Sequence, residues 1–170
     1  MSDEATLTAR PARREDAAAI TEIYNQGIED RIATFETEPR SVADIEPWFD
    51  HAHAFVAVTG RSGDVIGYAV AHPYSDRSCY RGIGEFSVYV RRSHRGRGVG
   101  QAAMAALVEA ARADGLWKLT SRIFPENRAS LALMARMGFD AIGVHRSHGK
   151  LDGVWKDCVI VELLIAENLA

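Results

Sequence analysis

Three glycines and five basic residues crowd into residues 91–100, directly before a stretch rich in alanine. The alanines favour a helix, whereas each glycine inside a helix costs about 1 kcal/mol relative to alanine. The glycines therefore predict a special backbone where the helix begins. A helix start offers free N–H groups that bind phosphate, and glycine lets the oxygens approach the backbone closely. The segment thus predicts a pyrophosphate site, with arginines as further cationic contacts.

Two nucleotide-binding motifs compete for this segment. Residues 98–103 fit the dinucleotide fingerprint GxGxxA, but that motif needs its first glycine directly after a strand and an acid roughly 20 residues later. The preceding strand is expected to end at Val90, and residues 118–121 contain no acid. A phosphate-binding loop of the Walker type needs Gly-Lys-Ser/Thr, where this chain has Gly100-Gln101-Ala102. A plain solvated turn would leave the glycine spacing unexplained.

Composition sets further limits on function. The chain has 170 residues, of which 47% are hydrophobic, so residues 1–170 are expected to form a single domain with a real core. The net charge of −3 argues against a nucleic-acid binder that works by bulk charge. The histidine pairs at residues 51/53 and 145/148 have no convergent acid or cysteine in sequence, so no metal site is expected.

Features linked to cell location are also scarce. The first seven residues lack the basic and apolar regions of a signal peptide, and no apolar run is long enough to span a membrane. Two cysteines far apart in sequence indicate a reducing compartment. The chain is therefore expected to be cytoplasmic, with no membrane partner.

Hydrophobic periodicity predicts an alternation of strands and helices around one sheet. Strands are expected over residues 6–12, 54–59, 65–71, 85–90, 117–124, 141–148 and 158–165, with residues 149–157 as the last connection. Helices are expected over residues 14–28, from residue 41 to about 49, over 101–114 and over 126–139. In the second helix the apolar face would be Val42, Ile45, Trp48 and Phe49. The fold class is therefore α+β in layers.

The spacing Arg95-x-x-Gly98-x-Gly100 resembles the acetyl-CoA signature [Q/R]-x-x-G-x-[G/A] of the GCN5-related N-acetyltransferases, the GNAT superfamily. The strand FSVYV before it and the later segment PENRASLALMARMGF also resemble that family. Within it, ITEIYNQGIED, GEFSVYV and GKLDGVWKDCVIVEL look most like phosphinothricin N-acetyltransferases. The stretches IEDRIATFETEPR and SRIFPENRAS are most similar to the arsinothricin-resistance branch.

The resemblance implies a mixed, mostly antiparallel sheet of about seven strands with helices on both faces. It also implies direct transfer from acetyl-CoA to an amine, without an acyl-enzyme. The strand before the signature splays from its neighbour in the family, and its free backbone groups pair with pantetheine. The implied acetyl-CoA contacts are Val88, Tyr89, Val90, Arg95, Gly96, Arg97, Gly98, Val99, Gly100, Gln101, Asn127 and Ser130.

The resemblance places a catalytic base at Glu85, at the head of the splayed strand. Many members carry a tyrosine as proton donor four residues before the Gly-Phe pair, but this chain has Met134 there. Tyr80 and Tyr89 remain as candidate donors, and the sequence does not choose between them.

The implied substrate is the α-amine of a small, amino-acid-like toxin such as phosphinothricin, methionine sulfoximine or arsinothricin. Arginine binds carboxylates in a two-pronged manner, so Arg77 and Arg81 are expected to hold its anionic groups. Tyr80 and Phe35 are expected to line its pocket, and relatives suggest a homodimer. Two alternatives stay open, namely a protein N-terminal or lysine acetyltransferase and a non-catalytic acyl-CoA-binding module.

Overall fold

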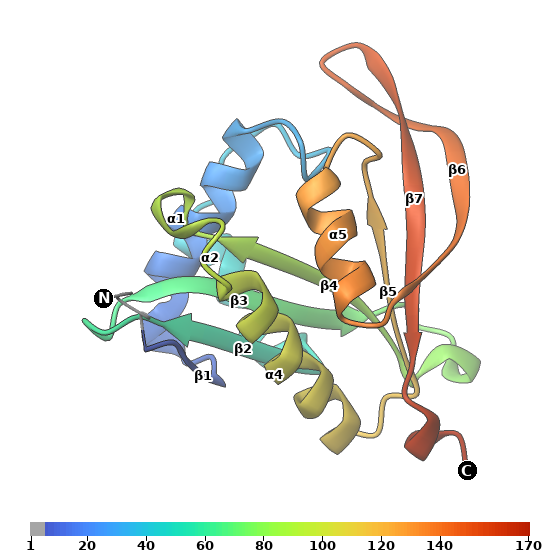
Figure 1. Ribbon diagram of the computed structural model, residues 1–170, viewed down its shortest axis with the longest axis horizontal. Coiled ribbons are helices and arrows are strands. Elements are labelled where there is room, and N and C mark those ends of the chain that lie inside the picture. Colours follow the sequence, from blue (N-terminus) through green and yellow to red (C-terminus); the bar gives the residue numbers. More distant parts are fainter. Residues whose placement is uncertain (1–5) are drawn as a thin grey trace.

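The computed structural model describes residues 6–170, and these build one sheet of seven strands (Figure 1). The strand order is β1-β2-β3-β4-β5-β7-β6, and only the β4–β5 pair is parallel. The mixed, mostly antiparallel sheet predicted above is therefore confirmed. The strands are β1 Thr8–Pro11, β2 Ala54–Thr59, β3 Val65–Pro73, β4 Ile83–Val90, β5 Lys118–Ile123, β6 Asp140–Leu151 and β7 Val154–Leu164.

Helices cover both faces of the sheet, as expected. On one face lie α1 (Ala17–Glu29), α2 (Val42–Ile45) and α3 (Trp48–His51), and on the other lie α4 (Val99–Ala113) and α5 (Arg128–Arg136). No helix in the described part of the chain is long and apolar enough to cross a membrane. The signal-peptide expectation falls mainly on residues 1–5, which lie outside the described residues.

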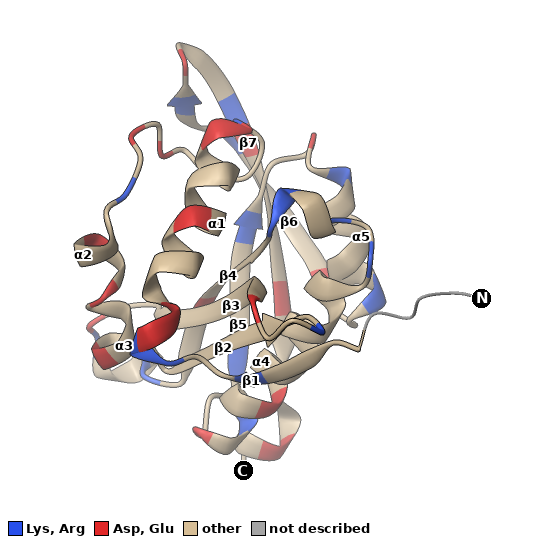
Figure 2. Cartoon of the chain, turned by 90° about the vertical axis from the view of Figure 1, so that its left-hand side faces the viewer, with Lys and Arg blue, Asp and Glu red and all other residues tan. Residues whose placement is uncertain are grey.

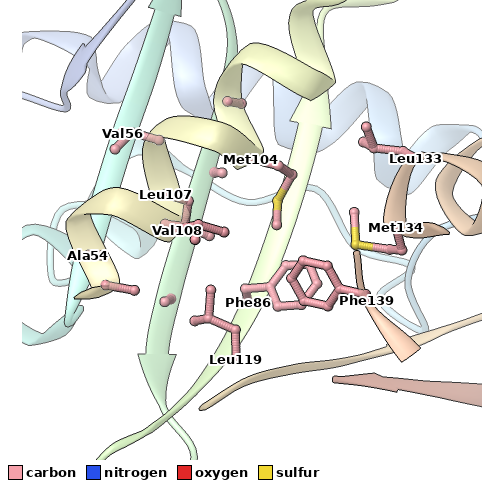
Figure 3. Packing of buried hydrophobic residues seen from close by; sticks show 14 of the residues in the cluster. Ala54, Val56, Phe86, Met104, Leu107, Val108, Leu119, Leu133, Met134 and Phe139 are labelled. Atoms are coloured by element: carbon pink, nitrogen blue, oxygen red, sulfur yellow. The ribbon is translucent and has the colours of Figure 1, made fainter. Parts of the chain in front are cut away.

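Two apolar cores hold these layers together, and β3 contributes to both. Alternate side chains of this strand point to opposite faces, so Tyr68 and Val70 join the α1 side while Ala69 and Ala71 join the α4 side. On the α4 side the ring of Phe86 packs against Phe139 with 5.1 Å between ring centroids (Figure 3). Because β3 is buried on both faces and pairs with β4, it fixes the position of β4 in the sheet.

The predicted second helix is broken in two. Its start is as expected, because the backbone N–H of Ser41 donates to the Asp44 carboxylate at 2.7 Å. Pro47 has no N–H to continue the helical ladder, and it lies between α2 and α3. The kink also changes the apolar face: Ile45 is buried, but Val42 is 38% exposed.

The final hairpin is longer than predicted. Residues 149–157 were expected to form a connection, but β6 and β7 extend through it and turn over Asp152 and Gly153 alone. Both turn residues have positive φ, 49° and 79°, as a two-residue Asp-Gly hairpin turn requires. The sequence contained this signal. The hairpin projects beyond the other strands, and β6 is a mostly exposed edge (Figure 1).

Candidate active site

The site begins where β4 and β5 separate. These parallel strands pair only from Ile83 to Glu85 on β4, opposite Lys118 to Thr120 on β5. At the next position the hydroxyl of Ser121 donates to the carbonyl of Phe86 at 2.9 Å, so a side chain replaces the backbone ladder. Beyond this point the backbone groups of β4 that face β5 have no strand partner. The splay that the resemblance implied is present.

The glycine-rich turn joins β4 to α4 at the open end of this splay. Gly96 and Gly98 have φ of 73° and 79°, values that L-residues rarely adopt. Gly98 is the N-cap of α4, so the helix begins at Val99, two residues earlier than predicted. The first amides of α4 lack partners within the helix. A Cβ at Gly96 or Gly98 would meet no atom within 4 Å, so the turn is open to a ligand.

A cavity of about 540 Å³ adjoins this turn. It lies among the end of β4, the starts of α4 and α5, and the loop that follows α1. Eleven of the twelve predicted acetyl-CoA contacts line it: Val88, Tyr89, Val90, Arg95, Gly96, Gly98, Val99, Gly100, Gln101, Asn127 and Ser130. Its walls combine apolar side chains with Arg95, Arg136 and the first amides of α4, so both apolar and anionic groups of a ligand find partners there.

Arg97 is the predicted contact that the structure places elsewhere. Its side chain lines a second cavity of about 480 Å³, together with Arg91, His94 and the β2–β3 turn. Consecutive residues of the turn face different sides because the glycines on either side of Arg97 both have positive φ. A role for Arg97 in binding acetyl-CoA stays a prediction.

Asp30 is a wall residue that the sequence did not reveal. It follows the last residue of α1, and its carboxylate lies 2.8 Å from Arg92 and 2.6 Å from Arg95. Partial burial pushes the pKa of Asp30 upward, but hydrogen bonds from Arg92 and Arg95 outweigh it and hold that pKa below its ordinary value. Arg91 likewise pairs with Glu22 on α1, which carries several acidic segments in Figure 2. Acidic residues in α1 and directly after it therefore hold Arg91, Arg92 and Arg95 in place.

Gly27 explains the position of Tyr89. A Cβ at Gly27 would lie 2.5 Å from the Tyr89 ring, so only glycine lets this ring rest on α1. Tyr24 contacts the same ring edge-on at 5.2 Å between centroids. Burial raises the pKa of the Tyr89 phenol, which therefore stays protonated at neutral pH. Neither Gly27 nor Asp30 has a local sequence signal, because both act through residues more than 60 positions away.

A smaller cavity of about 70 Å³ lies inside the splay itself. Val88 and Tyr89 of β4 face Ser121 and Arg122 of β5 across it. Asn127 lines both cavities, and its side chain also caps α5 by accepting from the backbone N–H of Ser130 at 3.2 Å. The capping role and the predicted ligand contact thus coexist.

Glu85 stands at the closed end of the splay. It is the last residue of β4 paired with β5, and it lies opposite His72 on β3. Its carboxylate accepts a hydrogen bond from Arg122 at 2.7 Å, and its side chain is 38% exposed. Burial lowers the pKa of His72, although Glu85 acts in the opposite direction. The predicted base thus lies next to the smaller cavity and remains reachable from solvent.

The predicted substrate residues fall into two places. Phe35 packs edge-on against Phe124 at 4.8 Å and touches Gly149 of the hairpin, next to the buried Cys158. The other three lie in the loop before β4. There Arg77 rests over the Tyr80 ring at 5.4 Å and Arg81 rests over a tryptophan ring at 5.7 Å. None of these four lines the cavities described here, and their binding role stays a prediction.

Histidine pairs do not build a metal site within residues 6–170. No group of three or more histidine, cysteine, aspartate or glutamate side chains is placed there to hold a metal ion. His145 and His148 instead stack on each other, with 4.4 Å between ring centroids.

Known proteins are similar to this chain in sequence. The chain is 33% identical over 162 residues to an L-methionine sulfoximine/L-methionine sulfone acetyltransferase of Pseudomonas paraeruginosa, covering 93% of this chain and 94% of that protein. It is 32% identical over 163 residues to a phosphinothricin N-acetyltransferase of Streptomyces coelicolor, covering 92% and 95%.

A solved structure also superposes closely. It is a GNAT superfamily phosphinothricin acetyltransferase from Sinorhizobium meliloti in complex with acetyl-CoA, with a TM-score of 0.87, 31% identity and coverage of 95% and 90%. The model of the acetyltransferase (GNAT) family matches residues 19–139, which include Glu85, the glycine-rich turn and α5. The chain therefore belongs to the acetyltransferase (GNAT) family and is an N-acetyltransferase that uses acetyl-CoA.

Proposed function

We propose that residues 1–170 act as one domain that acetylates the α-amine of a small, amino-acid-like toxin of the phosphinothricin, methionine sulfoximine or arsinothricin type. Relatives named for the first two compounds support this substrate class. The observation that carries the proposal is the junction of the glycine-lined cavity with Glu85 at the splay of β4 and β5.

The residues of the main cavity fit acetyl-CoA. The free amides of Val99, Gly100 and Gln101 grip the pyrophosphate, and the open glycines allow its approach. The backbone of Val88 and Val90 pairs with pantetheine, because β5 has diverged there. Arg95, Asn127 and Ser130 complete the contacts from the walls. When bound, acetyl-CoA supplies the activated acetyl group.

Holding the two reactants together is the larger catalytic contribution. Good positioning lowers a barrier by roughly 7–11 kcal/mol. A peptide α-amine has a reference pKa near 8, so removing its proton at pH 7 costs about 1.4 kcal/mol. The α-amine of a free amino acid is more basic because of the neighbouring carboxylate, so its deprotonation costs more than this. Glu85 takes this proton, directly or through a water molecule. A backbone N–H of β4 stabilises the oxyanion, a contribution of about 3–4 kcal/mol.

Tyr89 is the better candidate to donate a proton to the departing thiolate. It lines both cavities, whereas Tyr80 lines neither of them. Tyr80 instead lies between Arg77 and Tyr74 in the loop before β4. Met134, in the usual tyrosine position, is buried in the core and carries no proton.

In this proposal the amine is enclosed by the loop after α1 and by the loop before β4, which carries Arg77, Tyr80 and Arg81 and is called the rim below. Arg77 and Arg81 attract its anionic groups, while Tyr80 and Phe35 provide aromatic walls. The reducing cytoplasm is the compartment we propose, because Cys79 is exposed and Cys158 is buried, with no disulfide between them.

A thiol-release assay with a panel of amines tests the function. Phosphinothricin, methionine sulfoximine, arsinothricin, glutamate and a peptide with a free N-terminus are each offered with acetyl-CoA. We expect rapid turnover of at least one of the three toxins and little of the peptide. Turnover of the peptide alone would make the chain a protein acetyltransferase. Tight acetyl-CoA binding without turnover of any amine would make it a binding module.

Glu85→Gln removes the proposed base while keeping its size. We expect kcat to fall by about 10²–10⁴, with the Kd for acetyl-CoA unchanged by calorimetry. Glu109→Gln, at a largely exposed site on α4, is the control and retains activity. Equal kcat for Glu85→Gln and the parent protein across the pH range would exclude Glu85 from the mechanism.

Gly98→Ala tests the grip on the pyrophosphate. Gly98 and Gly115 both have strongly positive φ, and neither has an atom within 4 Å of a built Cβ. Alanine at either position therefore costs stability similarly, by about 1–2 kcal/mol. Only Gly98 lines the main cavity, so we expect Gly98→Ala alone to weaken acetyl-CoA binding, by roughly tenfold or more. Equal calorimetric affinities of the two variants would contradict this grip.

We also propose a homodimer formed through the β6–β7 hairpin. Five large apolar side chains of this hairpin are 52–59% exposed: Ile142, Val144, Val154, Trp155 and Leu164. Exposed apolar side chains on an edge hairpin are typical of a surface that another chain covers. Light scattering of the parent protein should give twice the mass of one chain. The Val144→Glu variant should give the mass of one chain, because a charge in the interface prevents dimer formation. Leu169→Glu, at an equally exposed site outside the hairpin, should stay dimeric. A monomeric parent protein would end this proposal.

A further inference from the structure

Arg122 occupies a position that the mechanism above does not use. Its guanidinium lies between the catalytic strand and the outer hairpin. One nitrogen donates to the Glu85 carboxylate at 2.7 Å, and another lies 3.4 Å from Nε2 of His148. The same side chain lines the small cavity inside the splay. Arg122 thus lies beside the proposed base and at the wall of the cavity inside the splay.

The sheet register puts Arg122 there. Thr120 is the residue of β5 that faces Glu85, and Arg122 follows two positions later on the same side of the strand. Because β4 has already separated from β5, the Arg122 side chain can reach back to Glu85. The β-bulge between His145 and Gly149 lies across from it and presents the stacked histidine rings.

An anion from solution can reach the guanidinium and compete with Glu85 for it. Arginine carries five N–H donors in a planar fork, and Glu85 accepts from one of its nitrogens. The Arg122 side chain is 47% exposed, so solvent and a small solute can reach it. The rim arginines differ, because Arg77 and Arg81 rest on aromatic rings and line neither cavity. Arg122, unlike these two arginines, lines the smaller cavity and contacts the proposed base.

We propose that Arg122 binds the α-carboxylate of the substrate and thereby selects free amino acids. This inference rests on the function proposed above. The α-amine and the α-carboxylate share one carbon atom, so a carboxylate held by Arg122 brings the amine beside Glu85. The bound carboxylate replaces Glu85 as the partner of the guanidinium. The Glu85 oxygen released in this exchange then accepts the proton of the ammonium group.

The exchange has a consequence for specificity. A peptide N-terminus has the same α-amine, but an amide stands where the free amino acid has its carboxylate. An amide does not replace Glu85 on a guanidinium, because it carries no charge. Peptides and α-carboxamides are thus poor substrates even where they fit the cavity. The rim arginines are left to hold the second anionic group of the toxin.

The test compares methionine sulfoximine with its α-carboxamide in the parent protein and in Arg122→Gln and Arg122→Lys. We expect the parent protein to prefer the acid by roughly 10- to 100-fold in kcat/KM, as a charge-assisted hydrogen bond implies. In Arg122→Gln we expect kcat/KM for the acid to fall and kcat/KM for the carboxamide to stay the same, so that the preference is lost. Arg122→Lys should recover part of the preference. Arg112→Gln, on α4 beside Glu109, serves as the control and keeps the full preference. Thermal melts verify that each variant is folded.

Other outcomes overturn the inference. An unchanged preference in Arg122→Gln means that Arg122 does not hold the carboxylate. If Arg77→Gln or Arg81→Gln loses the preference instead, that rim arginine binds the α-carboxylate. An equal fall for acid and amide means that Arg122 acts only by positioning Glu85. If the parent protein binds acetyl-CoA but acetylates no amino acid, the proposed function fails, and this inference fails with it.

Discussion

The separation of β4 from β5 after three residue pairs is the constraint on which the site depends. Parallel strands that continued to pair would leave β4 no free backbone groups and no space between Val88 and Ser121. The Ser121 hydroxyl satisfies the first carbonyl that loses its partner, so the separation begins without an unpaired buried group. Every later feature lies along the opening. The glycine-rich turn stands at its wide end, and Glu85 with Arg122 stands at its narrow end.

The sheet resists closing because its neighbours are fixed on both sides. β3 is buried on both faces, and it pairs with β4 along nearly the whole length of that strand. β5 is paired on its other side with β7 over six positions. Phe86 packs against Phe139 on the face of β4 opposite to Glu85. It follows the last β4 residue that pairs with β5, so this packing holds β4 where the pairing ends. Rigid strands on both sides position reacting groups more precisely than loops do.

Charge is arranged so that the cations of the turn are held before any ligand arrives. Asp30 and Glu22 of the α1 region pair with the three arginines that precede Gly96, namely Arg91, Arg92 and Arg95. Exposed ion pairs of this kind add little to stability, about 0–1 kcal/mol each. Their effect is geometric, because they link the glycine-rich turn to the loop that carries Phe35. The loop after α1 therefore begins with Asp30, which lines the main cavity, and also carries Phe35, the predicted substrate contact.

Local patterns determined much of this protein from sequence alone. The glycine-rich turn, the helix after it, the Ser41 cap and the strand that carries Glu85 depend on neighbouring residues, so their spacing predicted them, with the start of α4 two residues too late. The Asp152–Gly153 turn was equally local, and the prediction of a long connection overlooked it. Long-range placement was different. The pairing of Asp30 with Arg95, the contact of Gly27 with Tyr89, and the meeting of Arg122 with Glu85 join residues that only the sheet register and helix packing bring together. No periodicity encodes such contacts, because each depends on where two separately formed elements come to rest in the folded chain.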